Sequence, residues 1–379
     1  DFDEVQRIWN RASEKYKESV ERGLARQRDI VDSFPQKVKC MECGMTMTYM
    51  RYTNFGQSHG IRKGFYYCKE YDGKPGYCRQ KVHEDLLKIT VMDQIHNMIQ
   101  AMCDRKVLLE KMKEQNCLVD AYLRNREGVL VSRDKDSVPY TAQIWFEGRE
   151  CDTRSENDIL KSIRTLAQIH KIMQLPVEMD YAGRNLQEEY IRHNQEMKKI
   201  RRFIRKKGAV NSFEKDYLKS VEWFLQKGEE AAAMLETTDY KNLRQQSLQS
   251  GSICHGEYNQ HNVLILGKNT AVTNFSHWSF DVQMADLYRF MRKILEKYSW
   301  DLHLAQKMLS AYDSVRPLSE SEWQNLRVRF CYPEKYWKLA NHYYTHNKAV
   351  ISGKNVEKLR TLIHQKKQWE EFSKQCFRQ

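Results

Sequence analysis

The sequence predicts an α+β protein, with a small cysteine-containing β region flanked by helices and then a much longer, mostly helical part. Residues 36–82 hold short strand-like runs between glycines and four spaced cysteines. After residue 154, apolar residues recur almost everywhere at helical spacing. Two β-rich runs between residues 119 and 151 predict one further small hairpin.

Four regions follow one another along the chain. Residues 1–35 predict an amphipathic helix that ends at Pro35. After the cysteine region, residues 83–118 predict a linking helix whose apolar stripe suits either a coiled coil or packing on its own domain. Residues 119–379 predict one domain with a hairpin at 129–147, helices at 156–173, 186–207 and 212–235, and a break at 251–273.

Composition limits the class of protein. The 379 residues are enough for two or three domains, and their net charge of +13 favours polyanionic partners such as nucleic acid. No stretch approaches eighteen uninterrupted apolar residues, so we expect no membrane span and a cytoplasmic protein. The oligomeric state is not predicted.

The cysteine spacing predicts a structural zinc site. Cys40, Cys43, Cys68 and Cys78 form two pairs, the first with two intervening residues and followed by Gly44. Four thiolates complete the tetrahedron that zinc prefers and leave no open position for catalysis. The alternative is that these are buried or unpaired thiols.

The runs VKCMECGMTMTYMR and GFYYCKEYDGKPGYCRQKVHEDLL resemble the zinc β-ribbon of large serine recombinases. The resemblance covers about residues 1–105 and implies DNA binding. The family's catalytic domain, with its nucleophilic serine, has no counterpart in these 379 residues, so we expect no strand exchange from this chain by itself.

Basic residues outnumber acidic ones within the cysteine region. Nine lysines and arginines stand against three acidic residues between positions 36 and 82. Arg51, Arg62 and Lys63 lie between the cysteine pairs and are the predicted DNA contacts, which would bind phosphates in a salt-dependent way. The alternative is a solvated basic face without a partner.

A second motif lies in the helical part. His255-Gly256-Glu257 is followed by Asn262 and then by Asn274. Phosphoryl transfer in kinase-like folds needs a carboxylate for the acceptor hydroxyl, a metal-binding Asn five residues later and an acid after the next strand. This layout resembles the catalytic loop of the aminoglycoside phosphotransferase and choline kinase superfamily, whose pattern is His-Gly-Asp-x4-Asn followed by Ile-Asp-Phe.

Residues 108–377, including FEGREC and LAQIH, resemble the spore-coat CotS-type branch of that superfamily. The resemblance implies a kinase-like C-lobe, a residual N-lobe hairpin, and spore association. It also implies that His255 and Asp286 support the loop and that Asn262 is the metal-binding Asn.

Three departures weaken the implied activity. Glu257 replaces the catalytic Asp, and Asn274 replaces the metal-binding Asp. Sequence upstream of residue 108, where the family has its nucleotide lobe, is taken by the ribbon. We therefore expect Mg-ATP to bind poorly and the chain to be a non-catalytic, zinc-dependent DNA-binding fragment joined to a pseudokinase. The alternative is an ATP-dependent phosphotransferase or a spore-associated kinase-like protein.

The run 198–207, KKIRRFIRKK, carries seven positive charges. Such a helix could lie on nucleic acid or an anionic membrane. The alternative, which we favour, is a helix with a solvated basic side and an apolar edge packed inward.

Overall fold

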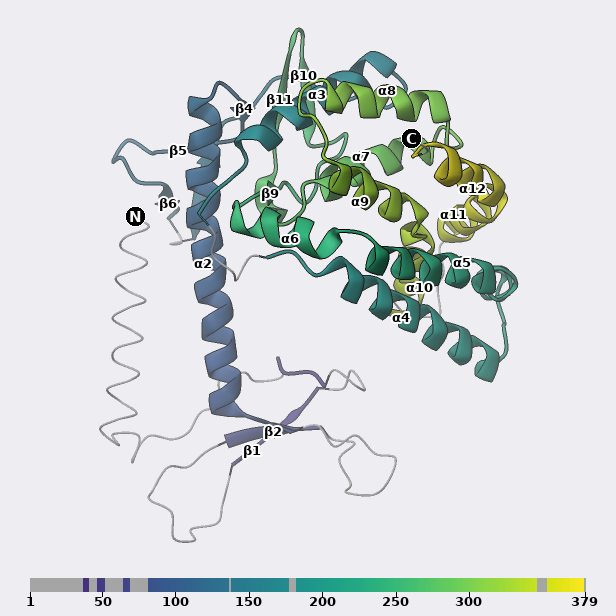
Figure 1. Cartoon of the computed structure of the whole chain (residues 1–379). Coiled ribbons are helices and arrows are strands. Elements are labelled where there is room, and N and C mark those ends of the chain that lie inside the picture. Colours follow the sequence, from purple (N-terminus) through teal and green to yellow (C-terminus); the bar gives the residue numbers. More distant parts are fainter. Residues whose placement is uncertain are drawn as a thin grey trace. The chain divides into compact units, whose positions relative to one another are not determined.

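The structure is a computed structural model of the chain (Figure 1). It describes residues 37–40, 46–51, 64–68, 81–135, 138–176, 182–345 and 353–377. The chain divides into two compact units, Asp1–Cys103 with Leu123–Ala142, and Asp104–Tyr122 with Gln143–Gln379. The helix predicted at 1–35 lies outside the described residues, and the predicted boundaries at 35, 82 and 118 stay predictions.

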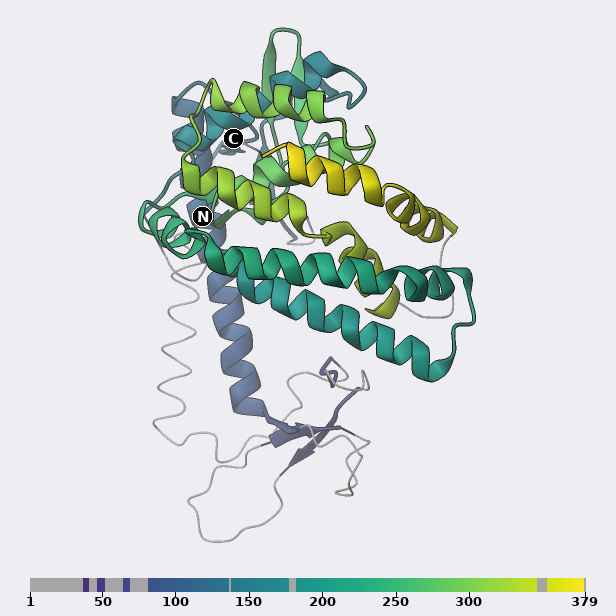
Figure 2. The ribbon, with the colours of Figure 1, turned by 45° about the vertical axis from the view of Figure 1, so that its right-hand side comes forward.

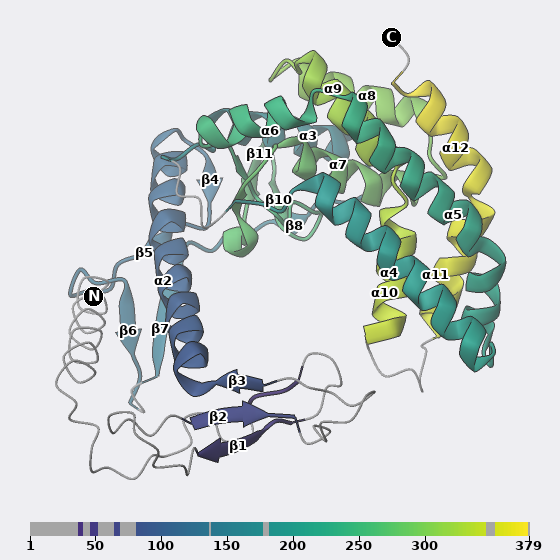
Figure 3. The ribbon, with the colours of Figure 1, turned by 60° about the horizontal axis from the view of Figure 1, so that its bottom comes forward.

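The first unit contains a three-stranded antiparallel sheet. Its strands are β1 (Thr48–Arg51), β2 (Gly64–Tyr67) and β3 (Lys81–His83), with β2 in the middle (Figure 3). Cys40, Met47, Tyr66 and Cys68 are buried together against this sheet. Gly64 has no room for a side chain, since a Cβ there would lie 2.0 Å from the Tyr49 hydroxyl.

The helix α2 (Glu84–Glu114) starts directly after β3 and confirms the helix expected after residue 83. Glu84 in its first turn is buried, accepts a hydrogen bond from the Tyr49 hydroxyl at 2.6 Å, and pairs with Lys88 at 2.8 Å. A carboxylate at this end of a helix is also favoured by the helix dipole.

The hairpin predicted at 129–147 is present but shorter. Strands β6 (Val131–Arg133) and β7 (Pro139–Gln143) pair antiparallel, and β5 (Tyr122–Leu123) lies on the other side of β7. Every residue of β7 is exposed, so this sheet has no buried core of its own.

The second unit is built around a small sheet whose order is β4-β11-β10-β8. These strands are β4 (Leu118–Val119), β8 (Arg149–Glu150), β10 (Val263–Leu266) and β11 (Asn269–Val272). A separate pair joins β9 (Ile253–Cys254) to β12 (Ser279–Phe280). The region 251–273, which apolar spacing predicted as a break between helices, contains three strands. Two of them, β10 and β11, lie between Asn262 and Asn274, where the kinase-like motif implied a strand.

Helices make up most of this unit (Figure 2). They are α3 (Glu156–Ile172), α4 (Leu186–Lys207), α5 (Ser212–Thr237), α6 (Tyr240–Gln249), α7 (Met284–Leu295), α8 (Leu302–Asp313), α9 (Glu320–Cys331), α10 (Glu334–Thr345), α11 (Gly353–His364) and α12 (Lys366–Gln375). None of the helices in the described ranges is long and apolar enough to span a membrane.

Helices α4 and α5 lie side by side and explain the basic run. Asn185 and Asn211 cap their N-termini, each accepting a backbone N–H. Four of the seven basic residues in 198–207 pair with carboxylates of α5: Lys198 with Glu229, Arg201 and Arg205 with Glu222, and Lys207 with Glu214. Ile200 and Ile204 are buried, which confirms the inward-packed apolar edge.

Candidate functional site

The motif His255 to Asn262 forms the loop between β9 and β10. Gly256 has a φ of +81°, and a Cβ there would lie 1.8 Å from the backbone oxygen of His277. Only glycine fits such a position without strain. The loop therefore makes a tight turn against the segment after β11.

Asp286, in the first turn of helix α7, stabilises the tight turn at Gly256. Its carboxylate is fully buried and accepts hydrogen bonds from the backbone N–H groups of His255 at 2.5 Å and Gly256 at 3.0 Å. Burial raises the pKa of Asp286, but the hydrogen bond with His170 and the charge of Arg289 outweigh it and lower the pKa. Asp286 is thus an ionised carboxylate that braces the loop; the resemblance implied its place as the brace but not its charge.

His170 of α3 supports Asp286 in turn. Its Nε2 lies 3.5 Å from Asp286 Oδ2, and its Nδ1 lies 2.7 Å from the Tyr312 hydroxyl. Burial lowers the pKa of His170 although Asp286 favours its charged form. Asp286 carries the negative charge, because it also accepts hydrogen bonds from two backbone N–H groups. His170 is neutral, because its burial lowers its pKa.

The His255 side chain links Glu257, in the loop, to Thr273, which follows β11. Its Nδ1 accepts the backbone N–H of Glu257 at 3.1 Å, so the proton is on Nε2, which donates to the Thr273 carbonyl at 3.0 Å. The backbone carbonyl of Glu257 accepts from the side-chain amides of Asn259 at 2.8 Å and Asn262 at 2.9 Å. The loop is thus held by its own side chains.

The structure brings Glu257, Asn262 and Asn274 together. Asn274 Nδ2 lies 3.4 Å from Glu257 Oε2 and 3.5 Å from Asn262 Oδ1. Its Oδ1 accepts from the Ser276 hydroxyl at 2.6 Å. The amide Nδ2 of Asn274 thus lies beside Glu257 Oε2 and Asn262 Oδ1, the side-chain oxygens that could bind a cation in this loop.

The backbone of Asn274 is fixed from another part of the chain. Asn274 has a φ of 65° and a ψ of 59°, a left-handed conformation that Asn adopts more readily than most residues. Its N–H donates to Asp120 Oδ2 at 2.8 Å, and burial raises the pKa of Asp120. Asp120 was not predicted as a site residue, and no local pattern links it to a residue 154 positions away.

These residues do not fit a strong magnesium site. Mg²⁺ in phosphotransfer sites is bound through carboxylates and substrate phosphates. Of the three converging side chains only Glu257 is charged, and its carboxylate also lies 3.8 Å from His277 Nε2. An amide N–H group, which cannot bind a cation, is directed at the remaining oxygens.

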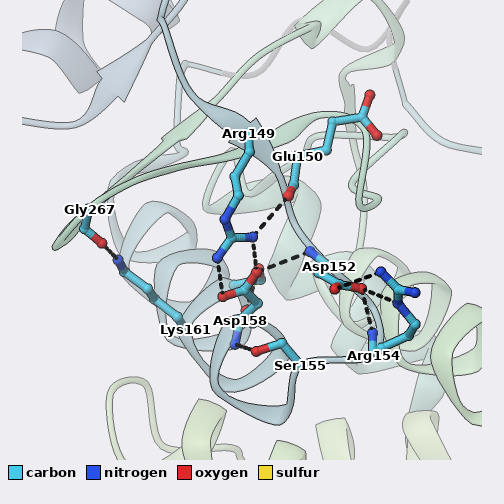
Figure 4. A network of polar contacts seen from close by, with 9 residues as sticks. Arg149, Glu150, Asp152, Arg154, Ser155, Asp158, Lys161 and Gly267 are labelled. Atoms are coloured by element: carbon cyan, nitrogen blue, oxygen red, sulfur yellow. Dashed lines mark hydrogen bonds and ion pairs between the residues drawn. The ribbon is translucent and has the colours of Figure 1, made fainter.

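A polar network fixes the edge of the sheet beside the loop (Figure 4). Arg149 of β8 binds both carboxylate oxygens of Asp158 in α3, and Ser155 caps that helix. The Lys161 ammonium donates to the Gly267 carbonyl at 2.6 Å in the β10–β11 turn. These contacts tie the FEGREC segment, α3 and the hairpin after the loop into one framework.

The predicted zinc and DNA residues are only partly described. Cys40 and Cys68 lie in one buried cluster of the first unit. Cys43, Cys78, Arg62 and Lys63 lie outside the described residues, and of Arg51 only the backbone, at the end of β1, is described. Within the described ranges no group of three or more His, Cys, Asp or Glu could hold a metal. The zinc site stays a prediction, since two of its ligands fall outside those ranges.

Comparison with known proteins identifies the family. A family model described as "Spore coat putative kinase YutH" matches residues 78–376. This chain belongs to that family. The match to the YutH family includes the whole loop from His255 to Asn274 and the bracing residues His170 and Asp286.

Two individual proteins are also similar to this chain. Spore coat protein S of Bacillus subtilis (strain 168) is 24% identical over 141 residues, 37% of this chain. The aligned part is 40% of that protein, so the chain spans about two fifths of the curated relative it matches. The crystal structure of an aminoglycoside phosphotransferase from Alicyclobacillus acidocaldarius subsp. acidocaldarius DSM 446 has a TM-score of 0.64 and 15% identity, covering 92% of this chain and 96% of that one.

The comparisons confirm the CotS-type resemblance as a spore coat kinase family and confirm the aminoglycoside phosphotransferase-like fold. The resemblance of residues 1–105 to a serine recombinase gains no support from them, and residues 78–105 fall within the match to the YutH family. It remains a prediction from the cysteine pattern.

Proposed function

We propose that this protein is a spore-associated member of the YutH family whose kinase fold acts by binding and not by Mg-ATP phosphotransfer. The observation that carries the proposal is the position of Asn274, whose amide contacts both Glu257 and Asn262. The spore association rests on the family and on the similarity to Spore coat protein S.

The physical reason for weak Mg-ATP binding is the loss of a negative charge at the position where the family has its metal-binding Asp. Replacement of the expected acid by Asn274 removes one negative charge, and its amide Nδ2 lies 3.4 Å from Glu257 Oε2 and 3.5 Å from Asn262 Oδ1, where a cation would need oxygen ligands. Glu257 in place of Asp moves the carboxylate by one methylene, and a displacement of about 1 Å can cost roughly 100-fold in rate. The replacements at Glu257 and Asn274 would both slow the phosphoryl-transfer step.

The test is the dependence of ATP binding on magnesium. Calorimetry on the purified chain, with Mg²⁺ and then with a chelator, should give the same weak or undetectable ATP affinity in both conditions. An affinity that rises tenfold or more with Mg²⁺ would show a working metal site and overturn the proposal.

A second candidate is a phosphotransferase that uses Glu257 as the base. It is favoured by the intact loop framework and by the Glu257 side chain, which is 45% exposed and accessible to an acceptor. ADP release that requires Mg²⁺ and is lost in Glu257→Gln would support this candidate. ADP release that is unchanged in Glu257→Gln would come from another source.

For the first unit we retain zinc-dependent DNA binding as a proposal. It is supported by the cysteine spacing, by the basic composition of residues 36–82 and by the common burial of Cys40 and Cys68. A gel shift with duplex DNA should disappear on zinc chelation and weaken with salt. Absence of a shift at low salt would remove DNA as a partner.

A further inference from the structure

A hollow of the second unit is lined by residues of α8, of α9 and of the C-terminal end of α12. Its volume is about 550 Å³, which lies within the range of roughly 300–1,000 Å³ that small-molecule sites occupy. None of its lining residues belongs to the loop from His255 to Asn274 or to the residues that brace this loop. The hollow is therefore a second place on the molecule where a ligand can bind.

Helix α9 supplies one wall of the hollow. Trp323 and Arg327 are four residues apart and both line the hollow, so they lie on the same side of the helix, about 6 Å from each other along its axis. Trp323 is half-buried and Arg327 is exposed. Within the part of the chain that the structure describes, the Trp323 indole and the Arg327 guanidinium make no hydrogen bond, ring contact or ion pair. This wall thus places an aromatic ring beside an unpaired cation.

Helix α8 supplies a polar wall. Gln306 and Ser310 are also four residues apart, and both line the hollow. Their side chains are exposed and make no hydrogen bond to other described residues. An amide and a hydroxyl can each donate and accept hydrogen bonds, as the hydroxyl groups of a ligand require.

The charge of Arg327 is not neutralised by the other charged residues of the hollow. Lys374 of α12 already pairs with Glu370 at 3.3 Å. Glu320 also lines the hollow, but it is seven residues from Arg327, or about 10 Å along α9, and it accepts a hydrogen bond from Gln324 at 3.0 Å. The end of the hollow at Arg327 is therefore positive.

A ring that carries hydroxyl groups and one acidic group fits these walls. The flat apolar face of an indole can pack against a sugar ring, and a guanidinium forms paired hydrogen bonds with a carboxylate or a phosphate. Gln306 and Ser310 would bind the hydroxyl groups. We propose that this hollow binds an acidic sugar, with Trp323 packed against the ring and Arg327 bound to the acidic group.

The test uses D-glucuronate as the probe and D-glucose as its neutral counterpart, each titrated into the full chain at low ionic strength and followed by saturation-transfer NMR. Glucuronate should bind about tenfold more tightly than glucose, because it gains a charge-assisted hydrogen bond. Arg327→Gln should remove this difference and leave glucose binding unchanged. Trp323→Leu should weaken the binding of both sugars.

Two substitutions elsewhere are the matched controls. Arg164→Gln changes an exposed arginine of α3, and Trp145→Leu changes an indole that is 85% exposed, so both variants should bind as the native chain does. Equal affinity for the two sugars, binding of neither, or the same weakening in the controls would overturn the proposal. Circular dichroism checks folding, and Arg327→Gln decides the question if Trp323→Leu does not fold, because Arg327 is exposed.

A second arm separates the sources of the acidic sugar. Tighter binding of glucuronate than of glucose 6-phosphate would assign the hollow to a carboxylated sugar, such as a unit of an acidic polysaccharide, and the reverse order would assign it to a sugar phosphate. AMP that binds more tightly than both, and loses affinity in Trp323→Leu, would make Trp323 a platform for a nucleobase and overturn the proposal. These titrations contain no Mg²⁺, so their outcome is independent of the Mg-ATP proposal.

Discussion

At the scale of single residues, Gly256 is the position where the loop tolerates least change. Gly256→Ala would combine a positive φ with a Cβ 1.8 Å from a backbone oxygen, whereas Gly267→Ala has a φ of +59° and nothing within 4 Å. The φ alone costs about 1–3 kcal/mol. We expect Gly267→Ala to lose an amount in this range and Gly256→Ala to lose clearly more, measured by urea denaturation. Equal losses would show that the close approach of Gly256 to His277 adds nothing to the cost of the positive φ.

Some residues of the candidate site could be predicted from the sequence and others could not. Glu257, Asn262 and Asn274 converge as their spacing along a kinase-like loop predicts. Asp120 could not be found, because its role depends on the parallel pairing of β4 with β11, which brings distant residues together. The sequence pattern LAQIH marked the segment that contains His170, but not its contact with Asp286.

At the scale of elements, the α4–α5 hairpin is held by one buried carboxylate. Glu214 is fully buried and accepts hydrogen bonds from the Lys207 ammonium at 2.6 Å, the Val210 N–H at 2.7 Å and the Tyr343 hydroxyl. Burial raises the pKa of Glu214, but Lys207 and Tyr343 outweigh it and lower the pKa. The carboxylate therefore links α4, α5 and α10.

Glu214→Gln should lower the free energy of unfolding by about 1–3 kcal/mol, because it weakens several buried hydrogen bonds at once. Glu222→Gln is the control, since Glu222 is 58% exposed and its pairs with Arg201 and Arg205 are worth at most about 1 kcal/mol. Chemical denaturation of the two variants measures the difference. Similar losses would show that Glu214 is solvated in solution.

Element boundaries were predictable where capping and apolar spacing agree. The range 186–207 was predicted from spacing and coincides with α4, which Asn185 caps. The strands β9 to β11 could not be predicted from residue pattern, because pieces of two to four residues carry too little alternation. Only the kinase-like motif implied a strand between Asn262 and Asn274. The exposed strand β7 was found through its turn and its β-forming residues, not through burial.

At the scale of the whole molecule, buried histidines should make stability depend on pH. Burial lowers the pKa values of His170 and His255, and lowers the pKa of His193, which stacks on Trp337, to about 3. The unfolded chain then binds more protons, so stability is complete above about pH 6.5 and falls as the pH drops below it. Each histidine contributes up to about 1.4 kcal/mol per pH unit.

Denaturation at pH 7.5, 6.5 and 5.5 should show this loss, and His193→Phe should make it shallower. His303→Phe, at an exposed position of α8, is the control and should leave the slope unchanged. Identical slopes in the native chain and in His193→Phe would contradict the buried, neutral state of His193.

We propose that Asn274 prevents metal-dependent nucleotide binding, and Asn274→Asp tests this proposal most directly. The change restores a carboxylate beside Glu257 and Asn262 without altering the size of the side chain, and Asn269→Asp, at the exposed start of β11, adds the same charge elsewhere. Calorimetric titration with ATP, with and without Mg²⁺, should show a Mg²⁺-dependent gain of about tenfold or more in Asn274→Asp alone, since one recovered charged contact is worth about 1.4 kcal/mol or more. If the native chain already binds Mg-ATP as tightly as Asn274→Asp does, Asn274 is not the barrier to metal-dependent nucleotide binding.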